Sequence, residues 1–130
     1  MIKALLAASA LAVCMSGAAS AQDAAAGEKV FAKCKACHVI DATTNRVGPS
    51  LHGIIGRTAG TVEGFKYSEA MAEAGKGGLV WDNANLDKYL TDPKAMMPGT
   101  KMIFAGIKGE REANDLWAFI SQYDKDGKTK

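Results

Sequence analysis

The residues best suited to carry chemistry in this 130-residue chain are Cys34, Cys37 and His38, which lie within Cys-Lys-Ala-Cys-His. Two thiols separated by two residues can each form a thioether with a vinyl group at one porphyrin edge, and the adjoining histidine is then placed to ligate the iron. This order and spacing are those of a c-type haem attachment site. We therefore expect one haem c, bound covalently through Cys34 and Cys37, with His38 as an axial ligand.

Two other kinds of site also use a Cys-x-x-Cys pair. A thioredoxin-like redox pair is expected beside a βαβ pattern, and no strand-like alternation of apolar and polar residues flanks Cys34. A structural zinc site needs four ligands, and the only further cysteine and histidine are Cys14 and His52. Because we expect Cys14 to be removed with a leader peptide, the zinc site is disfavoured further.

The N-terminus has the pattern of a secretory signal peptide. Lys3 is followed by an apolar run, and small residues then lead to an Ala-x-Ala site that ends at Ala21. The apolar run is too short for a permanent membrane span. We expect residues 1–21 to be cleaved after Ala21, so that residues 22–130 form one mature domain in the periplasm.

A lipid anchor at Cys14 is the minor alternative for this segment. Leu11-Ala12-Val13-Cys14 has a partial likeness to a lipoprotein signal, but Val13 is larger than the residue usually found before a lipidated cysteine. The Ala-x-Ala site therefore competes well with it, and we favour the unanchored form.

The charge of the chain is nearly balanced, with 16 Lys and Arg against 14 Asp and Glu. No basic stripe and no recognised nucleic-acid motif is present, so nucleic acid is not an expected partner. Any electrostatic attraction to a partner must come from how the charges are distributed and not from their sum. We expect a monomer.

Apolar periodicity predicts four main helices in an all-α fold. Asp23 is the expected N-cap of the first, whose apolar face leads into the haem motif. The second is predicted over Glu69 to Ala74, with Ser68 as its cap and Gly75 as its stop. In the third, Leu86, Tyr89 and Leu90 share a face, Asn83 or Asn85 is the cap and Pro93 is the terminator. In the last, which follows Gly109, the shared face is Leu116, Phe119, Ile120 and Tyr123.

Long irregular stretches separate these helices, notably residues 40–62 and 93–109. Structureless loops of that length are unusual in a compact domain, but a central cofactor gives them a surface on which to pack. We therefore expect helices and loops wrapped around the haem. The charged residues 124–130 are predicted to be a solvated, flexible tail.

The second axial ligand of the iron has five candidates in the mature chain: Met71, Met96, Met97, Met102 and His52. Most methionines in proteins are flexible core fillers, so residue type alone does not choose among them.

Three longer motifs resemble class I cytochromes c, both bacterial cytochromes c2 and mitochondrial cytochrome c. They are Gly48-Pro49-Ser50-Leu51-His52-Gly53, Gly56-Arg57 and the segment from Pro93 to Phe104 that contains Pro98-Gly99-Thr100-Lys101-Met102. The likeness runs from Gly27 to the last helix. It implies a class I cytochrome c fold with Met102 as the distal ligand, while Met96, Met97 and His52 fall at positions that do not ligate.

The resemblance also implies roles for other residues around the haem. The carbonyl of Pro49 is expected to accept the His38 Nδ1 proton, and Tyr89 to contact the methionine sulfur. The residues expected to hydrogen-bond or screen the propionates are Arg57, Tyr67, Trp81 and Thr100. Without the resemblance, ordinary core packing is the simpler role for Trp81 and Tyr89.

Two further implications concern the helices. Gly27, Phe31, Leu116 and Phe119 resemble a close crossing of the first and last helices, where Gly27 permits the approach. Between Ser68 and Leu79 the chain departs from the mitochondrial pattern by a few extra residues before Trp81, and there it is more similar to bacterial members.

With both axial positions filled, the chain has no place for a substrate, so the expected function is that of a one-electron carrier and not of an enzyme. The expected circuit leads from a bc1-type complex or a dehydrogenase to a terminal oxidase, reductase or photosynthetic reaction centre. Transient contacts are expected through four lysines around the haem edge: Lys33, Lys94, Lys101 and Lys108. The alternative is a peroxidase-like or ligand-binding haem protein, which needs an open distal site.

Overall fold

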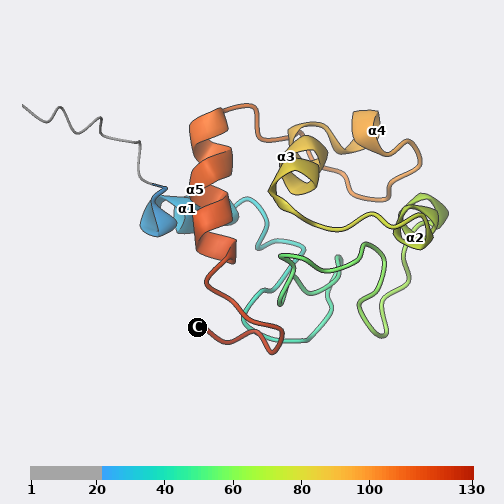
Figure 1. The fold of residues 1–130 in the computed structure, drawn as a ribbon, viewed down its shortest axis with the longest axis horizontal. Helices are drawn as coiled ribbons and strands as arrows, with labels where there is room; N and C mark the ends of the chain where they lie inside the picture. The colour runs from blue at the N-terminus through green and yellow to red at the C-terminus, as the bar shows by residue number, and fades with distance from the viewer. Residues whose placement is uncertain (1–21) are drawn as a thin grey trace, which may run out of the picture.

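The computed structural model describes residues 22–130, so the predicted signal peptide and Cys14 lie outside the described residues. This part of the chain forms five helices: α1 (Ala24–Phe31), α2 (Glu69–Lys76), α3 (Asn83–Thr91), α4 (Pro93–Met96) and α5 (Glu110–Ile120) (Figure 1). Long loops join them, and the β-type pairing within these residues consists of two isolated bridges. The expected all-α fold with long loops is therefore confirmed. None of the five helices has the length and apolar character that crossing a membrane requires.

The two terminal helices cross in close contact, as predicted (Figure 1). At the crossing Gly27 is buried, and a Cβ atom there would collide with the backbone carbonyl of Asp115 and lie 2.8 Å from the Cβ of Phe119. The rings of Phe31 and Phe119 pack with their centroids 5.1 Å apart. Asp23 caps α1, and its own backbone N–H donates to the buried Asp115 carboxylate at 2.9 Å. The crossing fixes the segment that follows α1, which carries the Cys-x-x-Cys-His motif.

Helix α2 begins at the predicted cap but continues beyond its predicted end. The Ser68 hydroxyl accepts a hydrogen bond from Met71 N at 3.1 Å, which confirms the cap. Gly75 does not stop the helix, so the predicted end at Ala74 was wrong. Gly75 lies inside α2, where a Cβ atom would collide with the backbone carbonyl of Ala59. Its missing side chain lets the helix approach the loop at Ala59. In the sequence alone, a glycine with this role cannot be told from one that ends a helix.

Helix α3 is capped by Asp82 and not by Asn83 or Asn85. The Asp82 carboxylate accepts from Asn85 N at 2.8 Å. The Asn85 side chain instead donates to the carbonyl of Val80 at 2.9 Å, which anchors the loop before the helix. Asp and Asn are equally good N-caps, so composition could not choose among these neighbours.

The short helix α4 was not predicted. Pro93, expected only to terminate α3, also begins α4, where its missing N–H costs no hydrogen bond. Asp92 separates the two helices and caps α4 by accepting from Ala95 N at 3.0 Å. This helix leads directly into the loop that carries Met102.

The C-terminal residues 124–130 fold back on the domain through backbone hydrogen bonds, while most of their side chains are exposed, as the prediction of a solvated segment requires. Lys130 N donates to the Gln122 carbonyl at 2.9 Å, and Asp124 N donates to the Lys128 carbonyl at 2.8 Å. Gly127 is buried against the loop at residues 41–42. Helix α5 ends before Tyr123, but the Tyr123 ring still packs edge-on against Phe119 with centroids 5.5 Å apart.

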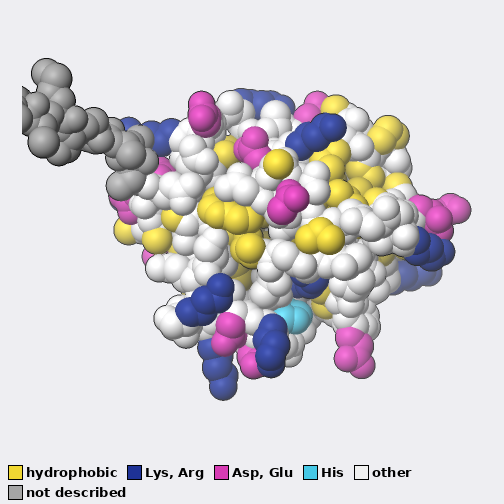
Figure 2. All heavy atoms as spheres, in the orientation of Figure 1, with side chains coloured by type: hydrophobic (Ala, Val, Ile, Leu, Met, Phe, Trp, Pro, Cys, Tyr) yellow, Lys and Arg dark blue, Asp and Glu magenta, His cyan; other side chains and the backbone are white. Residues whose placement is uncertain are grey.

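The buried core follows the crossing helices and extends beneath α3 and the loop after it. It contains Phe31, Leu116, Phe119 and Ile120 from α1 and α5, joined by Trp81, Leu86, Tyr89, Met97 and Ile107. Figure 2 shows hydrophobic side chains reaching the surface across the middle of the face drawn. Among residues 22–130, two large apolar side chains are mostly exposed, Val47 at 78% and Ile103 at 92%.

Candidate functional site

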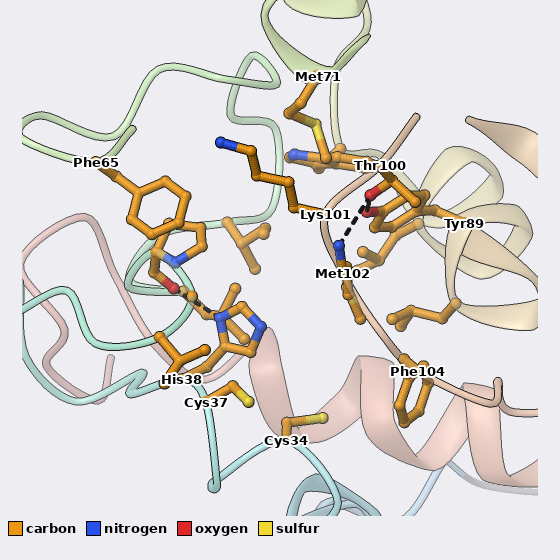
Figure 3. Close-up of a pocket in the computed structure, with 18 of the residues that line it drawn as sticks. Cys34, Cys37, His38, Phe65, Met71, Tyr89, Thr100, Lys101, Met102 and Phe104 are labelled. Carbon is orange, nitrogen blue, oxygen red and sulfur yellow. Dashed lines mark hydrogen bonds between the residues drawn. The ribbon is translucent and has the colours of Figure 1, made fainter. Parts of the chain in front are cut away.

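A cavity of about 370 Å³ lies inside the fold, with walls from α1, α2, α3, α5 and the loops (Figure 3). A volume of this order suits a small-molecule or cofactor site. All ten residues predicted from the sequence to surround a haem line this one cavity: Cys34, Cys37, His38, Pro49, Arg57, Tyr67, Trp81, Tyr89, Thr100 and Met102.

The attachment motif forms a tight turn directly after α1. Cys37 N and His38 N both donate to the carbonyl of Cys34, at 3.1 and 2.9 Å, so the three functional side chains lie on one short piece of backbone. Neither cysteine forms a disulfide. Burial raises the pKa of the Cys34 thiol to about 11, with a smaller opposing effect of Lys33. A redox-active Cys-x-x-Cys pair needs the reverse, a lowered thiol pKa, so this environment disfavours the thioredoxin-like alternative.

His38 presents one ring nitrogen to the cavity. Its Nδ1 lies 2.7 Å from the carbonyl oxygen of Pro49, as the sequence predicted. A carbonyl oxygen can only accept a hydrogen bond, so Nδ1 carries the hydrogen and Nε2 has a free lone pair. Figure 3 shows this second ring nitrogen on the side that faces the cavity. Burial is the main effect that lowers the pKa of His38, opposed by the Pro49 hydrogen bond, and burial thus favours the neutral form that a metal ligand requires.

The structure reduces the five candidates for the second axial ligand to two. Met102 and Met71 line the cavity, whereas Met96 and Met97 do not, and Met97 is buried in the core. His52 also lies outside the cavity lining, where its Nδ1 is 2.8 Å from the hydroxyl of Ser50.

Tyr89 and Thr100 hold the backbone that carries Met102. The Tyr89 hydroxyl lies 2.6 Å from the Thr100 hydroxyl, and Met102 N donates to the same Thr100 oxygen at 3.3 Å. The Tyr89 hydroxyl thus contacts Thr100, and the contact with the methionine sulfur that the resemblance implies stays a prediction. Burial is the main effect on the pKa of Tyr89 and raises it, which reflects a dry environment.

Arg57 brings an unsatisfied buried polar group to the cavity wall. Its guanidinium donates to the carbonyl of His52 at 2.7 Å, but Nε is buried and has no hydrogen-bond partner in the described residues. An orphaned donor on a cation is costly in an apolar cavity unless an anionic ligand group completes it. The nearby Tyr67 hydroxyl accepts from Val62 N at 3.0 Å, and the Trp81 ring packs against Tyr89 with centroids 5.1 Å apart.

Taken together, these residues fit a covalently attached haem. Two thiols and a neutral imidazole occupy one side of an apolar cavity, two thioethers line another, and a buried guanidinium offers a donor suited to a carboxylate. Sequence reasoning missed Phe65, Ser68 and Phe104 as further lining residues. Phe104 stands in the quoted Met102 segment, Ser68 was predicted only as a helix cap, and Phe65 carried no local signal.

Comparison with known proteins gives consistent matches. The family model for cytochrome c matches residues 24–124. Cytochrome c2 of Rhodoplanes tepidamans is 54% identical over 110 residues, which cover 84% of this chain and 100% of the relative. Cytochrome c-550 of Bradyrhizobium diazoefficiens is 53% identical over 108 residues, 82% of this chain and 77% of the relative.

Two solved structures share the fold and a high sequence identity. Cytochrome cH from Methylobacterium extorquens has a TM-score of 0.69 at 47% identity, covering 76% of this chain and 97% of that one. Cytochrome c2 from Rhodospirillum centenum has a TM-score of 0.73 at 41% identity, covering 78% and 98%.

Proposed function

The chain belongs to the class I cytochrome c family and is an electron-carrier cytochrome with one haem c attached through Cys34 and Cys37, and from this we propose that His38 and Met102 are the axial ligands of its iron. The observation that carries the proposal is the shared cavity. His38 directs a free nitrogen into it from one side, and Met102 lines it in a loop held by Thr100.

The backbone around Met102 supports its assignment as a ligand. Gly99 has a φ of +91°, so the chain reverses there in a conformation that glycine favours, and the loop then runs along the cavity wall. Thr100 fixes the Met102 N–H while Tyr89 fixes Thr100. A ligand that must keep its place through repeated changes of iron charge needs this kind of support.

The haem supplies a single-electron iron couple when it is bound. The chain's own residues bias that couple toward the reduced state, because a thioether is a soft ligand and an apolar enclosure disfavours the extra charge of the oxidised state. Pro49 keeps the His38 ring in one tautomer, and Arg57 offers its orphaned donor to a propionate. With both axial positions held by side chains, no position is left for a substrate, and the protein transfers electrons without acting as an enzyme.

We further propose that the protein works in the periplasm. Residues 1–21 would be a signal peptide cleaved after Ala21, and residues 22–130 would be the mature, monomeric domain. Its circuit would run from a bc1-type complex or dehydrogenase to an oxidase, reductase or photosynthetic reaction centre.

The partner surface would be a ring of lysines at the cavity mouth. Lys33 and Lys101 line the cavity, Lys94 is exposed on α4, and Lys108 lies on the loop that precedes α5. Lys33 forms an exposed ion pair with Glu112 at 3.3 Å. Charges arranged in this way can steer an acidic partner while leaving the complex weak enough to dissociate quickly.

The ligand assignment is tested by substituting each methionine in the holoprotein. Met102→Ala should open the sixth coordination position, so that carbon monoxide binds the reduced protein. Met97→Ala, in the core and outside the cavity lining, is the control for general loosening and should leave the position closed. If Met71→Ala opens the position and Met102→Ala does not, the assignment of Met102 is wrong.

A further inference from the structure

Helix α2 closes one wall of the cavity with a single long apolar side chain. Met71 is the only apolar residue of α2 larger than alanine. No residue of α2 is fully buried, but Met71 packs partly buried against the core beside Ala70 and Ala74. Figure 3 shows Met71 pointing from α2 toward the cavity, on the same side as Thr100 and Lys101. Met71 is therefore the residue through which α2 contributes to the cavity wall.

The backbone of Met71 is held in place from two directions. Its N–H donates to the Ser68 hydroxyl, and Ser68 is itself buried. Gly60, with a φ of +73°, approaches so closely that a Cβ atom would lie 3.1 Å from the Met71 carbonyl oxygen. One turn later, Gly75 packs directly against the carbonyl of Ala59. Because α2 is fixed against this loop, the Met71 side chain remains directed inward.

Met71 shares the cavity with the polar groups that support Met102. The Tyr89–Thr100 pair and the Met102 N–H contact each other within the cavity wall. Water admitted beside α2 would compete for these hydrogen bonds. It would also solvate charge on the iron, and solvent access is one of the factors that set the potential of a metal centre.

We propose that Met71 seals the α2 side of the cavity against water and thereby raises the reduction potential of the bound haem. This inference rests on the proposed function. Met71 would adjust the reduction potential without being a ligand of the iron. It lies in the segment where the chain departs from the mitochondrial pattern.

The test compares variants of similar size and opposite polarity in the holoprotein. Met71→Leu keeps an apolar seal without sulfur, whereas Met71→Gln introduces a polar group of similar length that attracts water. Met96→Gln places the same polar group on α4, outside the cavity lining, and is the control. The readouts are the midpoint potential from a spectroscopic redox titration and the hydrogen–deuterium exchange rate of residues 97–104.

Met71→Gln should raise the ratio of oxidised to reduced protein at a fixed ambient potential by about three- to tenfold, where tenfold corresponds to about 59 mV for a one-electron couple. It should also speed exchange in residues 97–104, while Met71→Leu and Met96→Gln stay close to the wild type. Met71→Ala, which makes space for water without adding a polar group, provides the same test if Met71→Gln does not fold.

Equal potentials for the Leu and Gln variants would overturn the proposal. So would a Met71→Leu spectrum that has lost the signature of thioether ligation, because Met71 would then be a ligand. Failure of the proposed function looks different, since the wild-type protein itself would then show no reversible one-electron titration.

Discussion

The imidazole Nδ1 of His38 lies 2.7 Å from the carbonyl oxygen of Pro49, and this contact decides which nitrogen of the ring is available to a metal. Pro49 also follows Gly48, whose missing side chain leaves room for the ring. A Cβ atom at Gly48 would lie 2.6 Å from Nδ1 and 2.8 Å from Nε2 of His38. The orientation of the His38 ring is thus set by two adjacent residues of one loop.

We predict that Gly48→Ala rotates or displaces the His38 ring and destabilises the holoprotein by about 1 to 3 kcal/mol, the usual cost of overpacking. The free energy of unfolding in guanidinium chloride measures the loss, and the electron paramagnetic resonance spectrum of the oxidised protein reports the ring orientation. Gly77→Ala is the matched control, because its nearest neighbours are 3.4 Å away and its φ is −75°. An unchanged resonance spectrum for Gly48→Ala would refute the steric argument.

The helix crossing makes a second prediction. Gly27→Ala should destabilise the holoprotein by about 1 to 3 kcal/mol or more, because the added Cβ meets backbone of α5 that cannot move aside as a side chain would. Lys29→Ala, on the exposed side of α1, should change stability by less than about 0.5 kcal/mol. Chemical denaturation of both variants measures the difference, and equal stabilities would mean that the crossing is not close in solution.

Apolar periodicity predicted the two helices that cross, and the resemblance to the family implied the crossing itself through Gly27, Phe31 and Phe119. Periodicity could not predict the short α4, because Pro93–Met96 gives too few residues for a period to be seen. The predicted helix boundaries were wrong in two situations. Gly75 could either end a helix or permit a close contact, and around Asp82 several equally good cap residues are neighbours in the sequence.

Some residues of the site could likewise be predicted from local spacing, whereas other features depend on the tertiary fold. Cys34, Cys37 and His38 follow from spacing alone. The hydrogen bond between Tyr89 and Thr100 joins residues 11 positions apart, and no local pattern requires it. Residue type alone left five candidate distal ligands, from which only the resemblance to the family chose Met102. The cavity lining independently leaves two of the five, Met71 and Met102.

The second histidine makes the stability of the holoprotein depend on pH. Burial is the main effect that lowers the pKa of His52; Arg57 lowers it further, while Asp126 opposes both. The folded protein therefore binds a proton at His52 less readily than the unfolded chain does. Stability should be unaffected by His52 above its ordinary pKa of about 6.5 and should fall as the pH drops below it.

Melting temperatures of the holoprotein between about pH 5 and 8, compared with those of His52→Asn, measure this contribution. The variant should lose part of the decline at acidic pH. Asp126→Asn should move the His52 titration, followed by proton NMR, to still lower pH because the opposing carboxylate is gone. A rise in the His52 pKa in that variant would contradict the electrostatic account.

The lysine ring makes a prediction about rates. Replacing Lys33, Lys94, Lys101 and Lys108 together by glutamine should slow oxidation by anionic ferricyanide by about tenfold at low ionic strength and flatten its salt dependence. The control replaces Lys29, Lys76, Lys125 and Lys128, which gives the same change in net charge at other places. If oxidation by ferricyanide slows equally in both variants, the net charge of the protein controls the rate of encounter and the position of the four lysines does not.

The most direct test of the central claim is the absorption spectrum of the exported, unmodified protein, oxidised and reduced, with and without carbon monoxide at neutral pH. Ligation by His38 and Met102 predicts a low-spin haem c spectrum that carbon monoxide leaves unchanged. A colourless mature chain, or ready binding of the gas by the reduced protein, would contradict it.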